Sequence, residues 1–211
     1  MRITMKKSPA LALLIAILIV LITNVPFSQA GFAQEVANNS KAKPSANSTL
    51  KRALPLKEGS VRFAIIGDTG TGTDKQYQVA ETMKKFHEIF PFTFVVMLGD
   101  NMYGGEKPKD YEKKFANVYE KLLTGKVKFY AALGNHDEAT QVNYEPFNMN
   151  GKEFYRFTKG NVAFYALNST YMDKRQVEWL ESELAKDTSE WKICFFHHPP
   201  YSSGGKHGSD K

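Results

Sequence analysis

The 211-residue sequence predicts an α/β fold in which a parallel sheet is followed by a hairpin. Three short apolar runs have the length of buried strands, and the segments between them carry apolar residues at helical spacing. This alternation is typical of βαβ units, whose strands run parallel. Farther along, two β-type segments are separated only by Lys159-Gly160, which indicates a hairpin. The length suits one well-packed domain.

The first 60 residues precede the predicted domain. Residues 1–30 have the pattern of a secretory signal peptide, with basic residues near the start, a continuous apolar run over 10–22 and small residues at the end. A membrane span needs about 20 residues, so the alternative is an uncleaved anchor lengthened through 23–25. Residues 31–60, rich in Ala, Asn, Ser, Lys and Pro, are expected to be a flexible linker. The expected location is secreted, periplasmic or at the cell surface.

The charge pattern does not predict a nucleic-acid partner. The formal net charge is +6, but Arg2, Lys6 and Lys7 belong to the predicted signal peptide, and no long Lys/Arg run follows. Membrane contact is expected only through an uncleaved N-terminal segment. The single Cys194 excludes an internal disulfide, and its place in an apolar run predicts a buried thiol.

The predicted domain begins with a strand over Val61 to Ile66. A helix follows, capped by Thr73 or Asp74 and ended by Pro91. Its apolar stripe consists of Val79, Met83, Phe86 and Ile89. The next strand is predicted over Phe92 to Leu98.

A second helix is predicted from Asp110 to Leu123 and a third strand from Val127 to Leu133. The apolar stripe of this helix consists of Tyr111, Phe115, Val118 and Leu122. The two hairpin strands are expected at Glu153 to Thr158 and at Asn161 to Asn168.

The last predicted helix runs from Asp173 to Ala185, with Asp173 as its N-cap. Its apolar face consists of Val177, Leu180 and Leu184. A strand over Trp191 to Phe196 follows, and it ends at two histidines because Pro199 cannot continue a ladder.

Polar side chains follow four of the predicted strands at the point where each strand ends. Asp68 and Asp100 follow the first two, Asn135 and His136 follow the third, and His197 follows the last. In open α/β sheets, ligands bind beyond the carboxyl ends of the strands. A single Asp at a strand end is commonly a helix cap or turn residue, but capping does not explain four such junctions.

Tyr103 adds a phenol three residues after Asp100. Carboxylate, amide, phenolate and imidazole ligands together favour iron, manganese or zinc. Two such cations repel at the roughly 3.5–4 Å of paired sites, and Asp100, on the middle junction, is the predicted bridge between them. The sequence therefore predicts a two-metal site for phosphoester hydrolysis. The alternatives are a Tyr103 ring that only packs on its loop and a His136 that is bonded to Asp137.

Four motifs occur in order along the chain. They are Gly67-Asp68-Thr69-Gly70, Gly99-Asp100-Asn101-Met102-Tyr103, Gly134-Asn135-His136-Asp137 and His197-His198-Pro199. The set resembles the calcineurin-like metallophosphoesterases. Within them, a Tyr at the position of Tyr103 is similar to the pattern of the purple acid phosphatase branch, of the tartrate-resistant acid phosphatase type. The resemblance runs from Val61 to Gly208. It implies a layered α/β/β/α sandwich, with the site at the C-terminal ends of the strands, in a metallophosphoesterase domain over 61–211.

The resemblance also implies a ligand set for two metal ions. Asp68 and Tyr103 would bind the first metal, Asp100 would bridge, and Asn135 and His197 would bind the second. Tyr103 would bind as phenolate, which in this branch goes with Fe(III). The second metal would be Fe(II), Zn or Mn.

The resemblance places His136 and His207 at the substrate, together with Asn135. A metal-held hydroxide would attack phosphorus, and His136 would protonate the leaving oxygen or stabilise the transition state. Small phosphate monoesters are the expected substrates. His198 is not expected to bind metal, because the His-x-Pro pattern gives that role to His197.

The family's Gly-His-x-His motif, which supplies one imidazole to each metal, does not occur in this sequence. A fragment, a second chain that completes the site, or a defective relative would each account for this. A fragment is the favoured interpretation, because His197 to Ser209 keeps active-site character. Three alternative functions follow: a phosphodiesterase of the same fold, a non-catalytic secreted phosphate-binding module, and a structural cell-surface domain.

Overall fold

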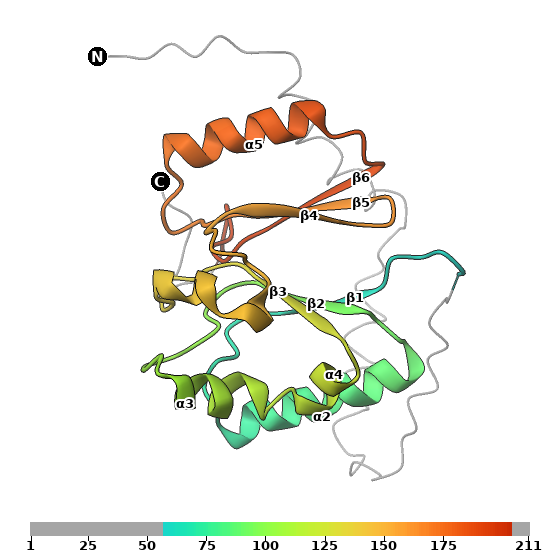
Figure 1. Cartoon of the computed structure of the whole chain (residues 1–211), viewed down its shortest axis with the longest axis vertical. Helices are drawn as coiled ribbons and strands as arrows, with labels where there is room; N and C mark the ends of the chain where they lie inside the picture. The colour runs from blue at the N-terminus through green and yellow to red at the C-terminus, as the bar shows by residue number, and fades with distance from the viewer. Residues whose placement is uncertain (1–56, 204–211) are drawn as a thin grey trace, which may run out of the picture. The chain divides into compact units, whose positions relative to one another are not determined.

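The computed structural model describes residues 57–203, which form four layers, with helices outside two packed sheets (Figure 1). The predicted signal peptide, most of the predicted linker and His207 lie outside the described residues. Within 57–203, none of the helices has both the length and the apolar character needed to cross a membrane. The layered α/β/β/α architecture expected from the sequence is confirmed.

The first sheet contains three parallel strands in the order β1 (Phe63–Ile66), β2 (Phe94–Met97) and β3 (Lys128–Ala131). All four residues of β2 are buried. A central parallel strand is covered on both faces, which is why its sequence is an unbroken apolar run. The predicted parallel sheet is confirmed, and the carboxyl ends of its strands meet at one edge.

The second sheet holds β4 (Tyr155–Lys159), β5 (Val162–Ala166) and β6 (Trp191–Phe195). Strands β4 and β5 pair antiparallel through a turn at Gly160, whose φ of 54° suits glycine, so the hairpin prediction is confirmed. Strand β6 pairs parallel to β5. It is an edge strand, and the prediction of a buried Cys194 on it is wrong, because that residue is exposed.

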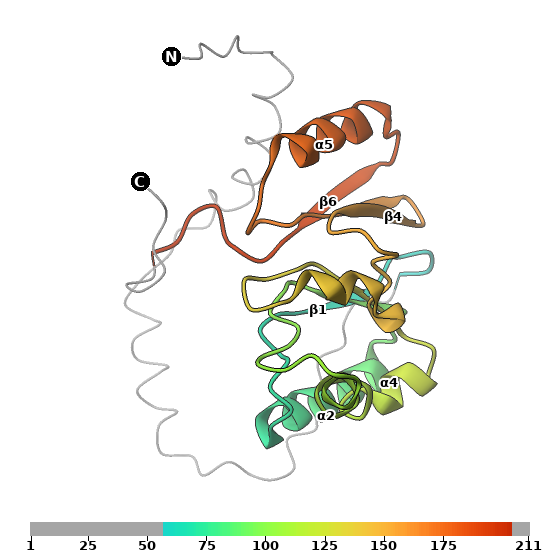
Figure 2. The ribbon, with the colours of Figure 1, turned by 60° about the vertical axis from the view of Figure 1, so that its left-hand side comes forward.

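Helix α5 (Lys174–Lys186) covers the outer face of the second sheet (Figure 2). The side chain of Asp173 accepts a hydrogen bond from the backbone N–H of Gln176 at 2.8 Å, which confirms the predicted N-cap. The only buried residue of the helix is Gln176. The predicted apolar face is therefore only partly covered, and Val177 is 40% exposed.

Helix α2 (Asp74–Ile89) packs on the outer face of the first sheet with a different face from the one predicted. Its buried residues are Gln76, Ala80 and Met83. The remaining members of the predicted stripe are exposed, namely Val79, Phe86 and Ile89. Their neighbour β1 is an edge strand whose Ile65 is 56% exposed. Helix α2 and β1 therefore line an apolar groove, because within 57–203 no strand continues the sheet beyond β1.

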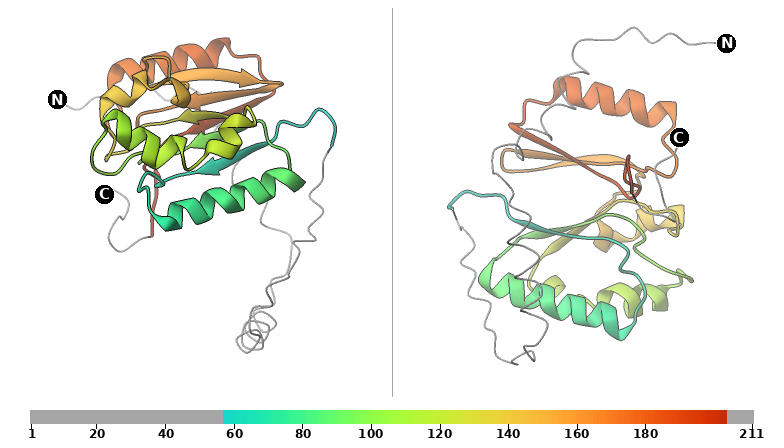
Figure 3. Two further views of the ribbon diagram at one scale, coloured as in Figure 1. Left: turned by 60° about the horizontal axis from the view of Figure 1, so that its bottom comes forward. Right: turned by 180° about the vertical axis from the view of Figure 1, so that it is seen from behind.

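The single helix predicted over Asp110 to Leu123 is wrong, since the segment has three parts. These are α3 (Pro108–Tyr111), the π-helix η2 (Glu112–Ala116) and α4 (Glu120–Thr124). Its apolar stripe nevertheless packs inward, with Phe115, Val118 and Leu122 buried. Figure 3 shows that α3 and α4 share the outer layer with α2.

An aromatic cluster joins the two sheets. Phe94 stacks on Phe63 at 5.2 Å between ring centroids and meets the edge of Phe164 at 5.3 Å. Phe157 stacks on Tyr130 at 3.8 Å. Such pairs each contribute about 0.5–1.5 kcal/mol beyond the burial of their area. The cluster fixes one sheet against the other, and so places the end of β6 beside the ends of the first-sheet strands.

Candidate metal centre

Two aspartates turn the chain where β1 and β2 end. Asp68 and Asp100 adopt left-handed backbone conformations, with φ of 56° and 51°. Only glycine adopts this region freely, although Asp and Asn tolerate it best among the other residues. The two loops are tied together, because the Asp68 N–H donates to the carbonyl of Gly99 at 3.1 Å. The sharp turns bring both carboxylates to the same place.

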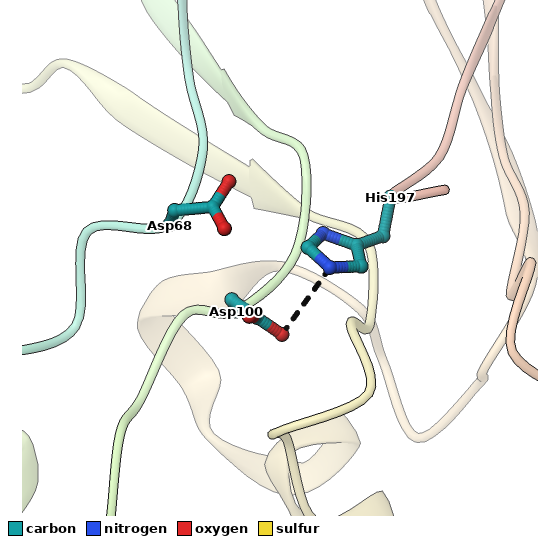
Figure 4. A group of neighbouring side chains, drawn as sticks. All are labelled: Asp68, Asp100 and His197. Carbon is teal, nitrogen blue, oxygen red and sulfur yellow. Dashed lines mark ion pairs between the residues drawn. The ribbon is translucent and has the colours of Figure 1, made fainter. Parts of the chain in front are cut away.

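His197 joins these two carboxylates from the second sheet (Figure 4). One ligand atom from each of Asp68, Asp100 and His197 lies within 4.8 Å of the other two. The ring atom Nδ1 of His197 is 3.1 Å from the carbonyl oxygen of Leu98. A carbonyl only accepts, so Nδ1 donates to it, and in the neutral imidazole Nε2 then presents its lone pair to the cluster.

The donor set fits a cation. The Nε2 atom of His197 faces two oxygens, Oδ1 of Asn135 at 3.1 Å and Oδ1 of Asp100 at 3.5 Å. Three electron-pair donors thus point at one another. Within 57–203, no Lys or Arg forms an ion pair with Asp68 or Asp100. A bound cation would satisfy these groups, and carboxylate, amide and imidazole are suitable ligands for Zn, Mn or Fe.

The phenol of Tyr103 belongs to the same cluster. Its hydroxyl donates to Oδ2 of Asp100 at 2.8 Å and to Oδ1 of Asp68 at 3.1 Å. Burial, together with the hydrogen bond and charge of Asp100, raises the pKa of Tyr103 well above its usual value. The phenol is therefore protonated in this arrangement, and it would bind a metal only by giving up that proton. These hydrogen bonds to Asp100 and Asp68 are not expected of a Tyr103 ring that only packs on its loop.

His136 lies beside the cluster. Its backbone N–H donates to Oδ1 of Asp100 at 3.1 Å, and its ring centroid is 5.0 Å from that of Tyr103. Among the hydrogen bonds of the described residues, none joins the His136 ring to Asp137, so the alternative of a ring held by that carboxylate is not observed. The ring of His198 instead contacts the hydroxyl of Ser169 at 3.1 Å.

Asp137 has a different role, which the sequence did not reveal. It accepts four hydrogen bonds, from the N–H groups of Gly134 and Met102 and from the side chains of Gln141 and Asn101. Burial raises the pKa of Asp137, and these hydrogen bonds partly offset the effect. The carboxylate thereby ties the loop after β2 to the loop after β3. Its partner Met102 is 35 residues away, so no local pattern predicted the contact.

Two glycines allow the loops to pass this closely. A Cβ on Gly134 would lie 2.3 Å from both the N and Oδ1 atoms of Asp100. A Cβ on Gly70 would lie 1.9 Å from the carbonyl oxygen of Asn101. Both contacts are with backbone or with the Asp100 carboxylate, so any larger residue would displace the loops of the cluster.

The fold and the cluster define an α/β/β/α protein with a carboxylate-rich candidate metal site at its strand ends. The family model for the calcineurin-like phosphoesterases matches residues 61–211. The chain belongs to this family.

Three relatives have named activities. Purple acid phosphatase 4 of Arabidopsis thaliana is 40% identical over 88 residues, which are 39% of this chain and 26% of that protein. Tartrate-resistant acid phosphatase type 5 of Homo sapiens is 23% identical over 186 residues, 68% of this chain and 57% of that protein. A 3',5'-cyclic-nucleotide phosphodiesterase of Nostoc sp. is 27% identical over 128 residues, 57% of this chain and 46% of that protein.

Among the solved structures that match, GAP50 has the same fold. GAP50 is described as the anchor in the inner membrane complex of Plasmodium, and the match has a TM-score of 0.51 and 26% sequence identity. The match covers 70% of this chain and 57% of GAP50. The present chain thus spans less than two thirds of the length of each of these relatives.

Proposed function

We propose that this protein hydrolyses phosphate monoesters at a dinuclear metal centre. The observation that carries the proposal is the contact of one phenol, that of Tyr103, with two carboxylates that also face His197. Two relatives that are named as acid phosphatases, a purple acid phosphatase and a tartrate-resistant acid phosphatase, support it. Hard oxygen ligands beside an imidazole suit the trivalent and divalent ions that such a centre needs.

The same residues divide between two ions. Asp68 and Tyr103 would hold Fe(III), Asp100 would bridge, and Asn135 with His197 would hold Fe(II), Zn or Mn. When bound, the ions would lower the pKa of coordinated water toward about 7 and neutralise charge on the phosphoryl oxygens. Asp100 suits the bridge because it is 3% exposed and directs its two oxygens at different partners, Tyr103 and His197.

His136 would serve the leaving group. Hydrolysis breaks the bond between phosphorus and the ester oxygen, and that oxygen must take up a proton as it departs. An imidazole is suited to donate the proton near neutral or acid pH. The His136 ring lies against Tyr103, and its backbone is bonded to Asp100, so it is held at the rim of the cluster. His207 is a second substrate-facing residue in this proposal.

Phosphodiesters are the second candidate substrates. The relative from Nostoc is a 3',5'-cyclic-nucleotide phosphodiesterase, and it matches 57% of this chain. A diester carries one negative charge where a monoester carries up to two. The ratio of the hydrolysis rates of a monoester and a diester would therefore also indicate how much positive charge the bound ions present to the substrate.

The deciding experiment measures metals and hydrolysis on the same sample. The full chain would be loaded with Fe and Zn, assayed for metal content, and given p-nitrophenyl phosphate and bis(p-nitrophenyl) phosphate. We expect about two metals per chain and preferential cleavage of the monoester. Asp100→Asn should abolish both properties. Asp74→Asn, on helix α2 outside the cluster, is the matched control and should change neither.

Each other outcome has a definite meaning. Preferential cleavage of the diester would favour the phosphodiesterase. Two bound metals with cleavage of neither ester would refute the enzyme and favour a phosphate-binding module. We also propose that the protein is exported through residues 1–30 and cleaved after them, and N-terminal sequencing of the mature chain tests the cleavage: a start near residue 31 is expected, and a start at Met1 would contradict cleavage and favour the uncleaved anchor.

A further inference from the structure

Lys114 is a buried lysine in the outer helical layer, and it contacts the loop that carries Tyr103. It lies in the π-helix η2, and its side chain is only 10% exposed. The ammonium donates to the carbonyl oxygens of Tyr103 at 2.8 Å and Gly105 at 2.7 Å. Its nearest carboxylate oxygen, in Asp110, is 3.9 Å away. Burial of a charge is costly unless it is well paired, and here the closest partners are loop carbonyls.

We propose that Lys114 is a positioning residue, which holds the loop after β2 so that the Tyr103 phenol reaches the two carboxylates. This inference rests on the proposed function of that cluster. The Tyr103 backbone is held on both sides, because its N–H donates to the carbonyl of Gly70 at 2.9 Å and its carbonyl accepts from Lys114. Gly104, with φ of 79°, and Gly105 come next and have no side chains that could anchor the loop.

The same lysine is also tied to the loop after β1. Its backbone carbonyl accepts from Nε2 of Gln76 at 2.8 Å, and Oε1 of Gln76 accepts from the Gly72 N–H at 2.6 Å. Gln76 is itself 5% exposed. Lys114 thus connects the loop of Asp68 to the loop of Tyr103 through buried and part-buried polar contacts, which are stronger than contacts in open solvent because fewer water molecules compete for them.

The loop after β2, which Lys114 contacts, is also bonded to the loop after β3. Glu106, one residue after the Gly105 carbonyl, accepts from Nε2 of Gln141 at 2.6 Å and from the backbone N–H of Glu138 at 2.9 Å. Removal of the Lys114 ammonium would therefore loosen the loop that orients Tyr103. Through Glu106, it would also loosen the segment after His136. The side chains of the cluster would all still be present, but their positions relative to one another would no longer be fixed.

The test compares Lys114→Met, which keeps the length of the stem and removes the ammonium, with Lys113→Met, a substitution of the exposed neighbour in the same π-helix. Two properties would be measured. The first is amide hydrogen exchange of residues 99–107 in the metal-free chain. The second is the absorption maximum and affinity of the Fe3+-loaded chain, which report the tyrosine ligand directly.

For Lys114→Met we expect exchange of residues 99–107 to become at least about 10-fold faster, the absorption maximum to shift, and Fe3+ affinity to fall about 10–100-fold, as when a ligand's supporting partner is lost. Lys113→Met should match the wild type. Unchanged exchange and absorption in Lys114→Met would overturn the inference. So would equal acceleration across β2 and β3, which would indicate general loss of stability.

If Lys114→Met does not fold, Lys114→Gln is measured and interpreted in the same way. Failure of the proposed function is distinguishable. A wild-type chain that binds no Fe3+ refutes the metal centre, whereas the exchange measurement on the metal-free chain still decides whether Lys114 holds the loop.

Discussion

The amide oxygen of Asn135 lies 3.1 Å from Nε2 of His197, across 62 residues of sequence. Asn135 follows β3 of the first sheet, and His197 follows β6 of the second. This contact therefore places the candidate site at the meeting of two sheets. The loops of either sheet alone could not supply the whole donor set.

His197→Ala should abolish binding of one metal while leaving the fold intact. The ring presents Nε2 to the cluster, and although its side chain is only 12% exposed, it is not part of the hydrophobic core, so its removal should cost little stability. We expect at least a 100-fold loss of hydrolysis and a drop in metal content measured by atomic absorption. His198→Ala is the control, because that ring is bonded to Ser169 at the rim. Equal losses in both variants would contradict the assignment.

Tyr103→Phe should remove the visible absorption of the Fe3+-loaded protein. The phenol is the group that contacts both carboxylates, and phenylalanine keeps only the ring. Tyr171→Phe is the control, since Tyr171 is 74% exposed. A spectrum that is unchanged in the Tyr103 variant would show that this phenol does not bind the metal.

Gly134→Ala should disable the site more severely than Gly104→Ala. A Cβ at Gly134 would lie 2.3 Å from Asp100, whereas a Cβ at Gly104 would meet nothing within 4 Å. Displacement of a site by about 1 Å can cost roughly 100-fold in rate. Gly104→Ala should cost only about 1–2 kcal/mol of folding stability, because of its positive φ. Rate and urea-unfolding measurements on both variants check this, and similar rates would refute it.

Asp187→Asn should lower stability by about 1–3 kcal/mol at neutral pH, because Asp187 accepts from Arg156 and Ser189 and pairs with Tyr165. Burial opposes ionisation of Asp187, but these hydrogen bonds outweigh it and hold its pKa below the usual value. The stabilisation is therefore present above about pH 4, the unfolded pKa, and is lost as the pH falls toward the folded pKa.

Thermal unfolding of wild type and Asp187→Asn from pH 2 to 7 tests this dependence. The two melting temperatures should converge at the acid end. Glu181→Gln, on the exposed surface of α5, should follow the wild type throughout. A constant difference between wild type and Asp187→Asn at all pH values would contradict the expected linkage.

The sheets and the order of the site loops could be predicted from the sequence, since they depend on local patterns. Strand β2 is an unbroken apolar run because both its faces are covered, and a polar residue marks the point where each site strand ends. Prediction of burial from the apolar pattern was wrong for helix α2. Its apolar stripe predicted burial, but β1 beside it is an edge strand, so Val79 and Phe86 remain exposed.

The supports of the site were missed because they join distant parts of the chain. Asn101 and Gln141 are 40 residues apart, and no periodicity relates them. Lys114 did leave a signal. It lies three residues after Tyr111 and four before Val118, which places a lysine on the apolar face of the predicted helix. A charge at such a position indicates a buried partner, and here the partners are loop carbonyls.

The left-handed backbone of Asp68 and Asp100 bears on how this protein could be engineered. Glycine would relieve the conformational cost at either position, so selection for thermostability alone should favour Asp68→Gly, and Asp100→Gly wherever the relief exceeds the loss of the hydrogen bonds that Asp100 accepts from Tyr103 and His136. Both substitutions would delete a carboxylate from the cluster. A library selected only for heat resistance would thus yield variants that are more thermostable but inactive. Any screen of this protein therefore needs a measurement of function alongside melting temperature.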